Sequence, residues 1–362
     1  MVLVFGAVSA LQQLEPRNAL KKSYPSACFV GCSTAGEICG TEVLDDSLIA
    51  TAIKFDHSRI QSISARLGDF EDAFQAGEYL AKTLPASLPA SDAKTQENLA
   101  HVLVFSDGLK VNGSELVRGL SKHLPAGITV TGGMAGDGAR FQETLVFCDN
   151  APQKDAIIAL GLYGDRLKIG FGSLGGWDSF GPERLITRSN GNVLYELDGQ
   201  SALALYKKYL GEHAAQLPAA GLLFPLSLRT KTGETAVVRA ILSIDEKEQN
   251  MTFAGDVPEG AYARLMKANF DRLIDGAAGA ARTSYQAIGS TSPDLAILIS
   301  CVGRKLVLKQ RIEEEVEGVR EVLGKRTILS GFYSYGEISP FTPGAKCELH
   351  NQTMTITTLS EA

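Results

Sequence analysis

The chain has 362 residues, of which 44% are apolar, and carries a formal net charge of −6 with an isoelectric point near 5.5. This length predicts about two domains of roughly 100–200 residues each. The acidic balance argues against a general nucleic-acid binder, which needs a basic face. No apolar run reaches the roughly 18 residues that a membrane-spanning helix requires. The six cysteines include no Cys-x-x-Cys pair, so they fit reduced thiols in a cytoplasmic protein better than a disulfide scaffold.

A unit made of an apolar run, an amphipathic stretch, a second apolar run and a glycine-rich tip occurs three times. Such a pattern is typical of a βαβ unit, in which a helix joins two parallel strands. We call the glycine-rich ends tip 1 (31–38), tip 2 (132–138) and tip 3 (331–338); tips 1 and 3 share the pattern Gly-x-x-x-x-Gly-Glu-Ile. The paired apolar runs are 2–5 and 27–30, 102–105 and 128–130, and 295–299 and 327–329, and the helices between them are expected at 14–24, 113–124 and 312–323.

Further strands and helices are predicted between and after these units. Apolar alternation and turn residues predict, in chain order, a hairpin of 47–55 and 60–67, a helix at 71–84, strands at 143–148, 155–163 and 166–174, a helix at 192–210, a hairpin of 236–244 and 251–254, a helix at 258–281 and a final strand at 347–358. The segment after tip 2 resembles the segment after tip 3. We therefore predict an α/β fold with mixed sheets and two duplicated halves, at 1–190 and 191–362.

Several of these segments resemble the FIST sensory domain. Tips 1 and 2 resemble its N-terminal half, whereas 197–206, 300–304, tip 3 and Cys347-Glu-Leu-His-Asn-Gln-Thr-Met354 resemble its C-terminal half. The resemblance covers essentially the whole chain and implies a cytoplasmic bacterial ligand sensor that is not an enzyme. One branch of the family binds haem, senses nitric oxide and signals to a histidine kinase or to a cyclic-di-GMP synthase or phosphodiesterase. The family commonly carries an extra segment before the first strand, whereas here Met1 directly precedes it.

The three tips supply our candidate ligand-binding residues. Glycines at strand ends let a ligand approach the backbone closely, and we expect one pocket between the two halves. Glu37, Asp137 and Glu337 are expected either to contact a ligand amino group or to cap backbone N–H groups. Tyr333 and Tyr335 alternate and are expected on one face, where they would line a pocket, bind a ligand or pack. The predicted ligand-binding residues are Ser33, Thr34, Glu37, Gly132, Gly133, Asp137, Tyr333, Tyr335 and Glu337.

His350 is the histidine that falls inside both a predicted strand and a family motif. It is either a hydrogen-bonded core residue or, following the resemblance, the axial ligand of a haem iron. Without a Cys-x-x-Cys-His motif, the haem would be held non-covalently. Glu348 and Gln352 are expected on the same strand face and would orient the imidazole, while Met354, about 13 Å along the strand, is too far to be the second axial ligand. Haem and an amino-acid-like ligand stay open as alternatives.

A hydrolase or thiol enzyme that uses Cys301 or Ser33 is the rival interpretation. Cys301 follows an apolar run, and the nearby Arg304 would lower its pKa, although a buried thiol is the plainer alternative. Ser33 does not lie in a Gly-x-Ser-x-Gly motif, and a serine hydrolase also needs a histidine and an acid brought to it by the fold. The sequence contains no Gly-x-x-x-x-Gly-Lys-[Ser/Thr] phosphate loop. A third interpretation is an interaction module whose acidic surface docks a kinase.

Zinc is a further candidate, because Cys28, Cys32 and Cys39 lie close together in the sequence. Structural zinc sites, however, combine such a cluster with a second matching pair. We therefore expect these three cysteines to be small buried residues.

Overall fold

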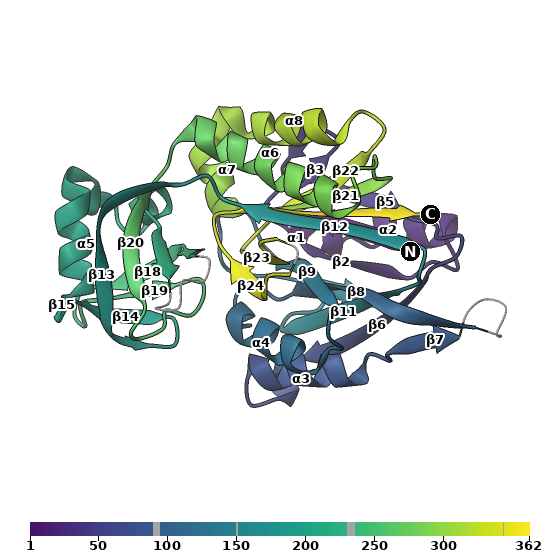
Figure 1. The fold of residues 1–362 in the computed structure, drawn as a ribbon, viewed down its shortest axis with the longest axis horizontal. Coiled ribbons are helices and arrows are strands. Elements are labelled where there is room, and N and C mark those ends of the chain that lie inside the picture. The colour runs from purple at the N-terminus through teal and green to yellow at the C-terminus, as the bar shows by residue number, and fades with distance from the viewer. Residues whose placement is uncertain (90–94, 150, 230–235, 343) are drawn as a thin grey trace.

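The structure, a computed structural model, describes residues 1–89, 95–149, 151–229, 236–342 and 344–362. These residues form a large body of three β-sheets and a smaller β-lobe beside it (Figure 1). Helices cover the outer faces of the body. Parallel and antiparallel pairs share the same sheets, so the predicted α/β fold with mixed sheets is confirmed.

All three predicted βαβ units are present, each with a parallel strand pair. The pairing places the first glycine of each tip opposite an apolar residue of the preceding strand: Gly31 opposite Val4, Gly132 opposite Val104, and Gly331 opposite Leu298. The elements of the three units are β1 (Val2–Gly6), α1 (Val8–Gln12), α2 (Leu14–Ser23) and β2 (Phe29–Ser33); β8 (Gln96–Ser106), α4 (Gly113–His123) and β9 (Thr129–Met134); and β21 (Leu295–Cys301), α7 (Val302–Leu308), α8 (Ile312–Leu323) and β22 (Ile328–Ser334).

After each tip the chain crosses into the sheet of another unit. Strand β3 (Glu37–Cys39), after tip 1, pairs with β22 of the third unit. Strand β10 (Val146–Cys148), after tip 2, pairs with β2 of the first unit, and β23 (Gly336–Pro340), after tip 3, pairs with β9 of the second unit. The three units thus exchange strands in a cycle, which gives the body an approximate internal threefold arrangement and brings the tips together.

Each unit closes with an antiparallel strand, and two of the three sheets are then extended further. Strands β5 (Leu48–Ala52), β11 (Ala156–Tyr163) and β25 (Met354–Glu361) pair with β1, β8 and β21. Strand β6 (Arg59–Arg66) extends the second sheet and β12 (Leu167–Leu174) the third. The predicted hairpin of 47–55 and 60–67 is therefore wrong, because β5 and β6 lie in different sheets. The sheet of β1 ends at β5 within the described residues.

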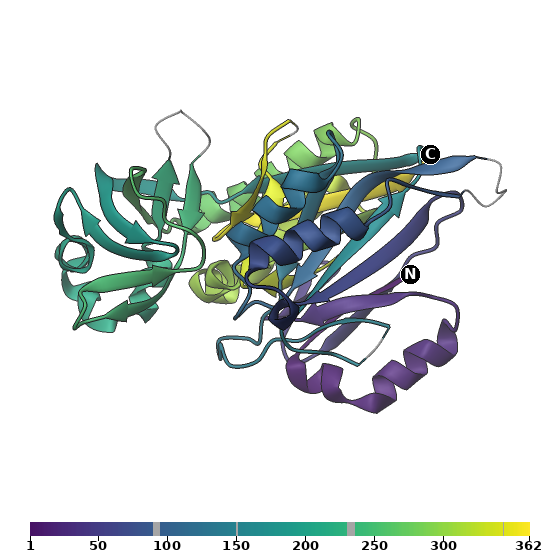
Figure 2. The ribbon, with the colours of Figure 1, turned by 90° about the horizontal axis from the view of Figure 1, so that it is seen from below.

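The helices follow the same arrangement. Helix α3 (Ala73–Thr83) packs against α4, and α6 (Phe270–Ala287) packs against α8. Helices α1 and α2, purple in Figure 2, lie beside the first sheet. Short strands complete the body: β4 (Glu42–Leu44) pairs with β3, β7 (Ser87–Pro89) with β8, and β24 (Cys347–His350) with β23.

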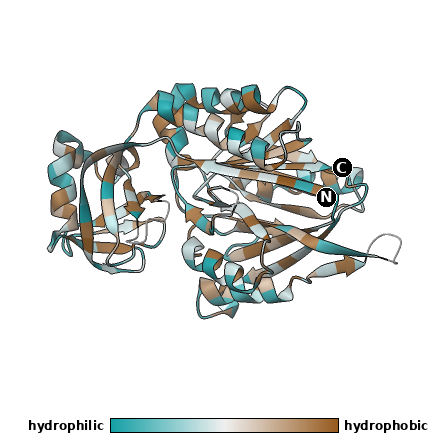
Figure 3. Cartoon of the chain, viewed as in Figure 1, coloured by the Kyte–Doolittle hydropathy of each residue, from teal (hydrophilic) through white to brown (hydrophobic). Residues whose placement is uncertain are grey.

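One apolar core lies where the inner faces of the three sheets meet. Phe5, Phe105 and Phe332, one from each unit, lie in it with ring centroids 4.6–6.3 Å apart. Figure 3 shows mostly hydrophobic strands inside the body and hydrophilic residues on the outward faces of the helices. Burial of each large apolar side chain contributes roughly 1.5–3 kcal/mol, so this core stabilises the junction of the three units.

The lobe is formed by residues 178–229 and 236–267, which follow β12 and precede α6. Its helix α5 (Ala202–Leu210) begins ten residues later than predicted, because 193–197 and 200–201 form strands. The predicted helix at 258–281 begins only at Phe270. Asp198 and Gly199, with φ of 50° and 73°, form the tight hairpin turn that such a pair favours. The predicted hairpin of 236–244 and 251–254 is confirmed as β18 and β19. The lobe strands are β13 (Asp178–Asn190), β14 (Val193–Leu197), β15 (Gln200–Ser201), β16 (Leu226–Arg229), β17 (Val237–Arg239), β18 (Ile241–Asp245), β19 (Asn250–Phe253) and β20 (Tyr262–Lys267).

The predicted final strand is broken at residues 351–353 into β24 and β25, which lie in different sheets. Gln352 has a φ of 62°, a left-handed conformation that ends an extended strand. The expectation that Glu348, His350, Gln352 and Met354 share one strand is therefore wrong. The domain boundary at 190 falls at the end of β13, within the lobe.

Candidate functional site

The three tips are in direct contact through backbone hydrogen bonds. Ala35 N donates to Tyr333 O at 2.7 Å, and Tyr333 N donates to Gly36 O at 2.8 Å, which joins tips 1 and 3. Gly136 N donates to Ser33 O at 2.9 Å, which joins tips 2 and 1, and Tyr335 N donates to Met134 O at 3.2 Å, which joins tips 3 and 2. The predicted ligand-binding residues thus gather in one place, but as a closely packed hub.

Glu37 and Glu337 occupy equivalent positions and make equivalent contacts. Glu337 accepts hydrogen bonds from Ser334 Oγ at 2.7 Å, Thr353 N at 3.2 Å and Thr353 Oγ1 at 3.0 Å. Glu37 accepts hydrogen bonds from Thr34 Oγ1 and from Ser47 in the loop that follows the tip, where the donors are Ser47 N at 3.2 Å and Ser47 Oγ at 2.6 Å. Both carboxyls are buried, and burial raises their pKa, that of Glu337 to about 8. Each acid holds the chain segment that follows its own tip.

Asp137 positions the loop after tip 2. Its carboxylate accepts hydrogen bonds from the backbone N–H groups of Phe141, Gln142 and Glu143 at 2.8–2.9 Å and from the Tyr335 hydroxyl. The Phe141 ring stacks on the Tyr335 ring with centroids 4.4 Å apart. Asp137 therefore fixes an aromatic pair at the edge of the hub, and no direct ligand contact is needed to explain its position.

The other predicted site residues are also buried in the hub. Ser33 Oγ accepts a hydrogen bond from Leu145 N at 2.8 Å, and Tyr333 donates from its hydroxyl to Glu315 at 2.8 Å. A side chain at Gly132 would meet Val104 O, and one at Gly133 would meet an isoleucine methyl group. Their direct contact with a ligand stays a prediction.

A hollow of about 310 Å³ lies between the hub and the lobe, and we call it the lobe hollow. Three apolar side chains on its wall are notably exposed, namely Leu109 (39%), Phe141 (40%) and Leu242 (46%). They come from the β8–α4 loop, the loop after tip 2 and the lobe strand β18. Apolar walls with a few polar groups are typical of small-molecule sites. The remaining lining residues are Gly108, Lys110, Val111, Asn112, Gly113, Met134, Asn192, Phe253, Ala254, Gly255 and Tyr335.

Polar contacts next to this hollow connect the lobe to the body. Asn112 Nδ2 donates to Asp256 Oδ1 at 2.9 Å, and Asp256 N donates to Ser114 Oγ at 3.3 Å. The buried Arg239 of the lobe donates from Nη1 to Leu349 O at 2.9 Å, and burial lowers its pKa to about 10. A molecule in the hollow would therefore touch both sides of the lobe–body junction.

His350 is completely buried beside this junction. Its Nε2 donates to Ser339 O at 2.7 Å, and Phe341 packs edge-on against the ring at 4.1 Å. Burial lowers its pKa to about 4, so the imidazole is neutral. An iron porphyrin needs an open face beside the axial nitrogen, but His350 does not line the lobe hollow. The residues around His350 therefore do not fit a bound haem.

Three consecutive side chains here carry buried acceptor atoms that have no hydrogen-bond partner among the residues that the structure describes: His350 Nδ1, Asn351 Oδ1 and Gln352 Oε1. Gln352 also reaches the lobe, because its Nε2 donates to Leu222 O at 3.3 Å. Buried acceptors generally require a donor, often an ordered water. The 350–352 segment thus brings several buried polar groups to the junction between body and lobe.

Cys301 and Arg304 do not form the activated pair that the rival interpretation requires, and Cys301 is the buried thiol of the plainer alternative. The Cys301 thiol is buried, and burial raises its pKa, which is the opposite of what a nucleophilic thiolate needs. The Arg304 guanidinium is fully buried and is instead paired with Glu315, with Nη2 and Nε at 2.7 and 3.0 Å from Oε2. The positive charge of Arg304 is therefore paired with the Glu315 carboxylate inside the core.

The raised pKa of Glu337 predicts a pH-dependent stability. The folded chain holds the proton at Glu337 to about pH 8, whereas the ordinary value is 4.5. This contribution to stability is fully present below pH 4.5 and is lost as the pH rises toward 8, because the folded state then binds more protons than the unfolded state. As the pH is raised from about 5 to about 8, we expect the urea concentration at the unfolding midpoint of the wild type to decrease relative to that of Glu337→Gln. Parallel curves for the two proteins would contradict this.

Comparison with known proteins identifies the family. A model of the FIST N domain matches residues 1–200, and a model of the FIST C domain matches residues 202–340. The chain belongs to the FIST family. FIST domains are signal-transduction sensor domains and are sensory, not catalytic. In the described part of this FIST protein, no helix is long and apolar enough to cross a membrane.

A curated relative matches most of the FIST chain. It is an uncharacterised protein of Methanocaldococcus jannaschii, 25% identical over 275 residues, which are 71% of this chain and 52% of the relative. The chain thus spans about half the length of this relative.

Tyr335, which lines the lobe hollow, was among the predicted ligand-binding residues, but most other lining residues were not predicted. Leu109, Asn112 and Gly113 follow the carboxyl end of β8, where ligands of α/β sheets commonly bind, so this signal was available. Leu242 and Phe253 could not have been found, because the position of the lobe against the body depends on contacts between residues far apart in the sequence.

Proposed function

We propose that this FIST protein is a sensor that binds a small molecule in the lobe hollow. The observation that carries the proposal is the gathering of Leu109, Phe141 and Leu242, three exposed apolar side chains from separate segments, on the wall of one hollow. Exposed apolar surface that collects around a concavity marks a binding site more often than scattered apolar residues do.

The ligand that suits this hollow is small, with a ring or branched apolar body and a polar end. Phe141, which stacks on Tyr335, offers aromatic surface to the apolar part. The second Nδ2 hydrogen of Asn112, beyond the one that is bonded to Asp256, offers a polar contact to the other end. An aromatic or branched amino acid has this chemistry, and it is the alternative that we favour over haem because His350 is enclosed.

The signal would pass through the lobe–body junction. A ligand that touches both Leu242 of the lobe and Phe141 of the body stabilises the arrangement in which the lobe is docked on the body. It shifts the equilibrium between docked and undocked arrangements to the extent that it binds the docked one more tightly. We propose a histidine kinase or a cyclic-di-GMP synthase or phosphodiesterase as the partner that reads this change, and the cytoplasm as the location.

A ligand screen tests the proposal. Thermal unfolding of the purified protein is measured in the presence of each of the standard amino acids and of small aromatic acids. A ligand present at 100 times its Kd should add about 2.7 kcal/mol to the free energy of unfolding. Phe141→Ala should weaken that binder about tenfold, since it removes one aromatic wall while the backbone bond to Asp137 remains. A Soret band in protein purified from haem-supplied cells, together with no binder in the screen, would contradict the proposal.

A further inference from the structure

We propose that Cys28, Cys148 and Asp149 form a binding site for Zn²⁺ or a similar thiophilic divalent cation. Cys28 directly precedes β2, Cys148 is the last residue of its antiparallel neighbour β10, and Asp149 follows it. One ligand atom from each residue, two sulfurs and one carboxylate oxygen, lies within 4.8 Å of the other two. The site is separate from the lobe hollow and does not depend on the proposed sensor ligand.

The spacing of the donors fits a tetrahedral metal ion. The Sγ atoms of Cys28 and Cys148 are 3.9 Å apart. Two thiolates bound tetrahedrally at a Zn–S distance of about 2.3 Å lie about 3.8 Å apart, so the two sulfurs already have the spacing that such an ion requires. Asp149 Oδ1 accepts a hydrogen bond from Phe29 N at 2.8 Å, which orients the carboxylate as outer contacts orient metal ligands.

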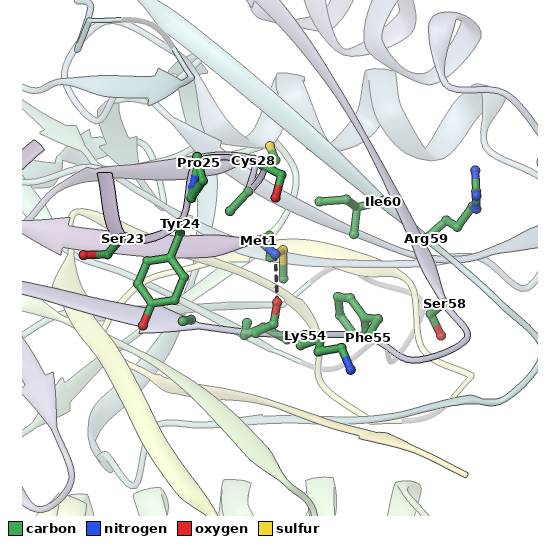
Figure 4. Close-up of a pocket in the computed structure, with 14 residues that line it drawn as sticks. Met1, Ser23, Tyr24, Pro25, Cys28, Lys54, Phe55, Ser58, Arg59 and Ile60 are labelled. Carbon is green, nitrogen blue, oxygen red and sulfur yellow. Dashed lines mark hydrogen bonds between the residues drawn. The ribbon is translucent and has the colours of Figure 1, made fainter. Parts of the chain in front are cut away.

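The surroundings also favour metal binding. A divalent metal ion binds cysteine sulfurs as thiolates and displaces their protons. Cys28 and Cys148 are only partly buried, and Cys28 borders a hollow of about 700 Å³ that Figure 4 shows with Met1, Tyr24 and Pro25.

This site replaces the cysteine cluster suggested by the sequence. Cys32 is buried in β2 within the apolar core, and Cys39 is exposed on β3, which lies in another sheet. The partner of Cys28 is Cys148, 120 residues away in the sequence. The trio of Cys28, Cys32 and Cys39 is therefore not a zinc site.

Cobalt titration tests the proposal directly. The full chain, reduced and stripped of metal with a chelator, is titrated with Co²⁺ under nitrogen and then with Zn²⁺. We expect one equivalent of Co²⁺ to give sulfur-to-cobalt charge-transfer absorption and tetrahedral d–d bands, which Zn²⁺ abolishes. Cys28→Ser and Cys148→Ser should each remove the charge-transfer signal of the pair. Asp149→Asn should keep that signal and weaken binding by roughly 10–100-fold.

Cys39→Ser is the matched control, because it removes an exposed thiol outside the site, and it should bind Co²⁺ like the wild type. A thermal melt of each variant distinguishes loss of metal binding from loss of fold. The proposal is overturned if the reduced wild type binds no Co²⁺, or if Cys28→Ser and Cys148→Ser both bind it normally. A pair that binds no metal but closes to a disulfide under mild peroxide also overturns it and is instead a redox pair.

Discussion

Gly331→Ala is expected to prevent stable folding of the FIST body. A Cβ atom at Gly331 would lie 1.8 Å from Leu298 O and 2.7 Å from the carbonyl carbon of that residue. Leu298 is the residue paired with it in the neighbouring parallel strand, in the middle of a sheet whose flanking strands are also fixed. Neither backbone can move without breaking the ladder, so we expect a loss of at least about 3 kcal/mol.

The internal threefold arrangement makes this prediction testable at two more positions. Gly31 and Gly132 are equivalent to Gly331, and their added Cβ atoms would lie 1.7 and 1.9 Å from the carbonyl oxygens of their strand partners. Gly68→Ala is the control, because nothing lies within 4 Å of that site and no unusual φ is found there. Urea unfolding is the measurement. A Gly331→Ala midpoint equal to that of Gly68→Ala would show that the strand register is wrong.

Removal of the Arg304 charge is expected to have a similarly large effect. Arg304 and Glu315 are both 0% exposed. Glu315 also accepts hydrogen bonds from Ser300 Oγ at 3.1 Å and Tyr333 OH at 2.8 Å, and Arg304 Nη2 also donates to Leu273 O at 2.7 Å. Arg304→Met leaves the Glu315 carboxylate buried without its counter-charge, which costs about 3–5 kcal/mol.

A double-mutant cycle separates the pair from its surroundings. Arg304→Met combined with Glu315→Leu should cost clearly less than the sum of the two single changes, because no uncompensated charge is left buried. The surface pair of Arg229 and Glu183, each 38% exposed, provides the comparison: Arg229→Met should destabilise the protein far less than Arg304→Met, because solvent screens the exposed charges. Equal losses for Arg304→Met and Arg229→Met in urea unfolding would contradict the buried network.

The repeated units could be predicted from the sequence because their signals are local. The apolar runs around 2–5, 102–105 and 295–299 and the helical patterns between the paired runs report strand and helix periodicity directly. The exchange of β3, β10 and β23 between sheets could not be predicted, because it depends on pairing between segments far apart in the chain. The same is true of the approach of Cys28 to Cys148.

The tips show a different limit. Their glycines and acids were identified correctly as a place where three segments gather, but the pattern of Glu37 and Glu337 is the same for a ligand contact and for a backbone cap. Only the loop partners Ser47 and Thr353 distinguish the two, since they occupy the carboxylates with protein donors. Asp198-Gly199, by contrast, was a readable hairpin signal that the helical pattern of the following residues obscured.

Calorimetric titration of Leu242→Arg with the tightest ligand from the amino-acid and aromatic-acid screen tests the central claim most directly. Leu242 is exposed on the lobe side of the lobe hollow, so arginine there fills the hollow with a charged side chain without disturbing the core. Leu174→Arg, an equally exposed leucine (45%) on β12 away from the hollow, is the control. We predict at least a roughly tenfold loss of affinity, about 1.4 kcal/mol, for Leu242→Arg and no change for Leu174→Arg. Wild-type affinity in Leu242→Arg would contradict a ligand site between the lobe and the tips.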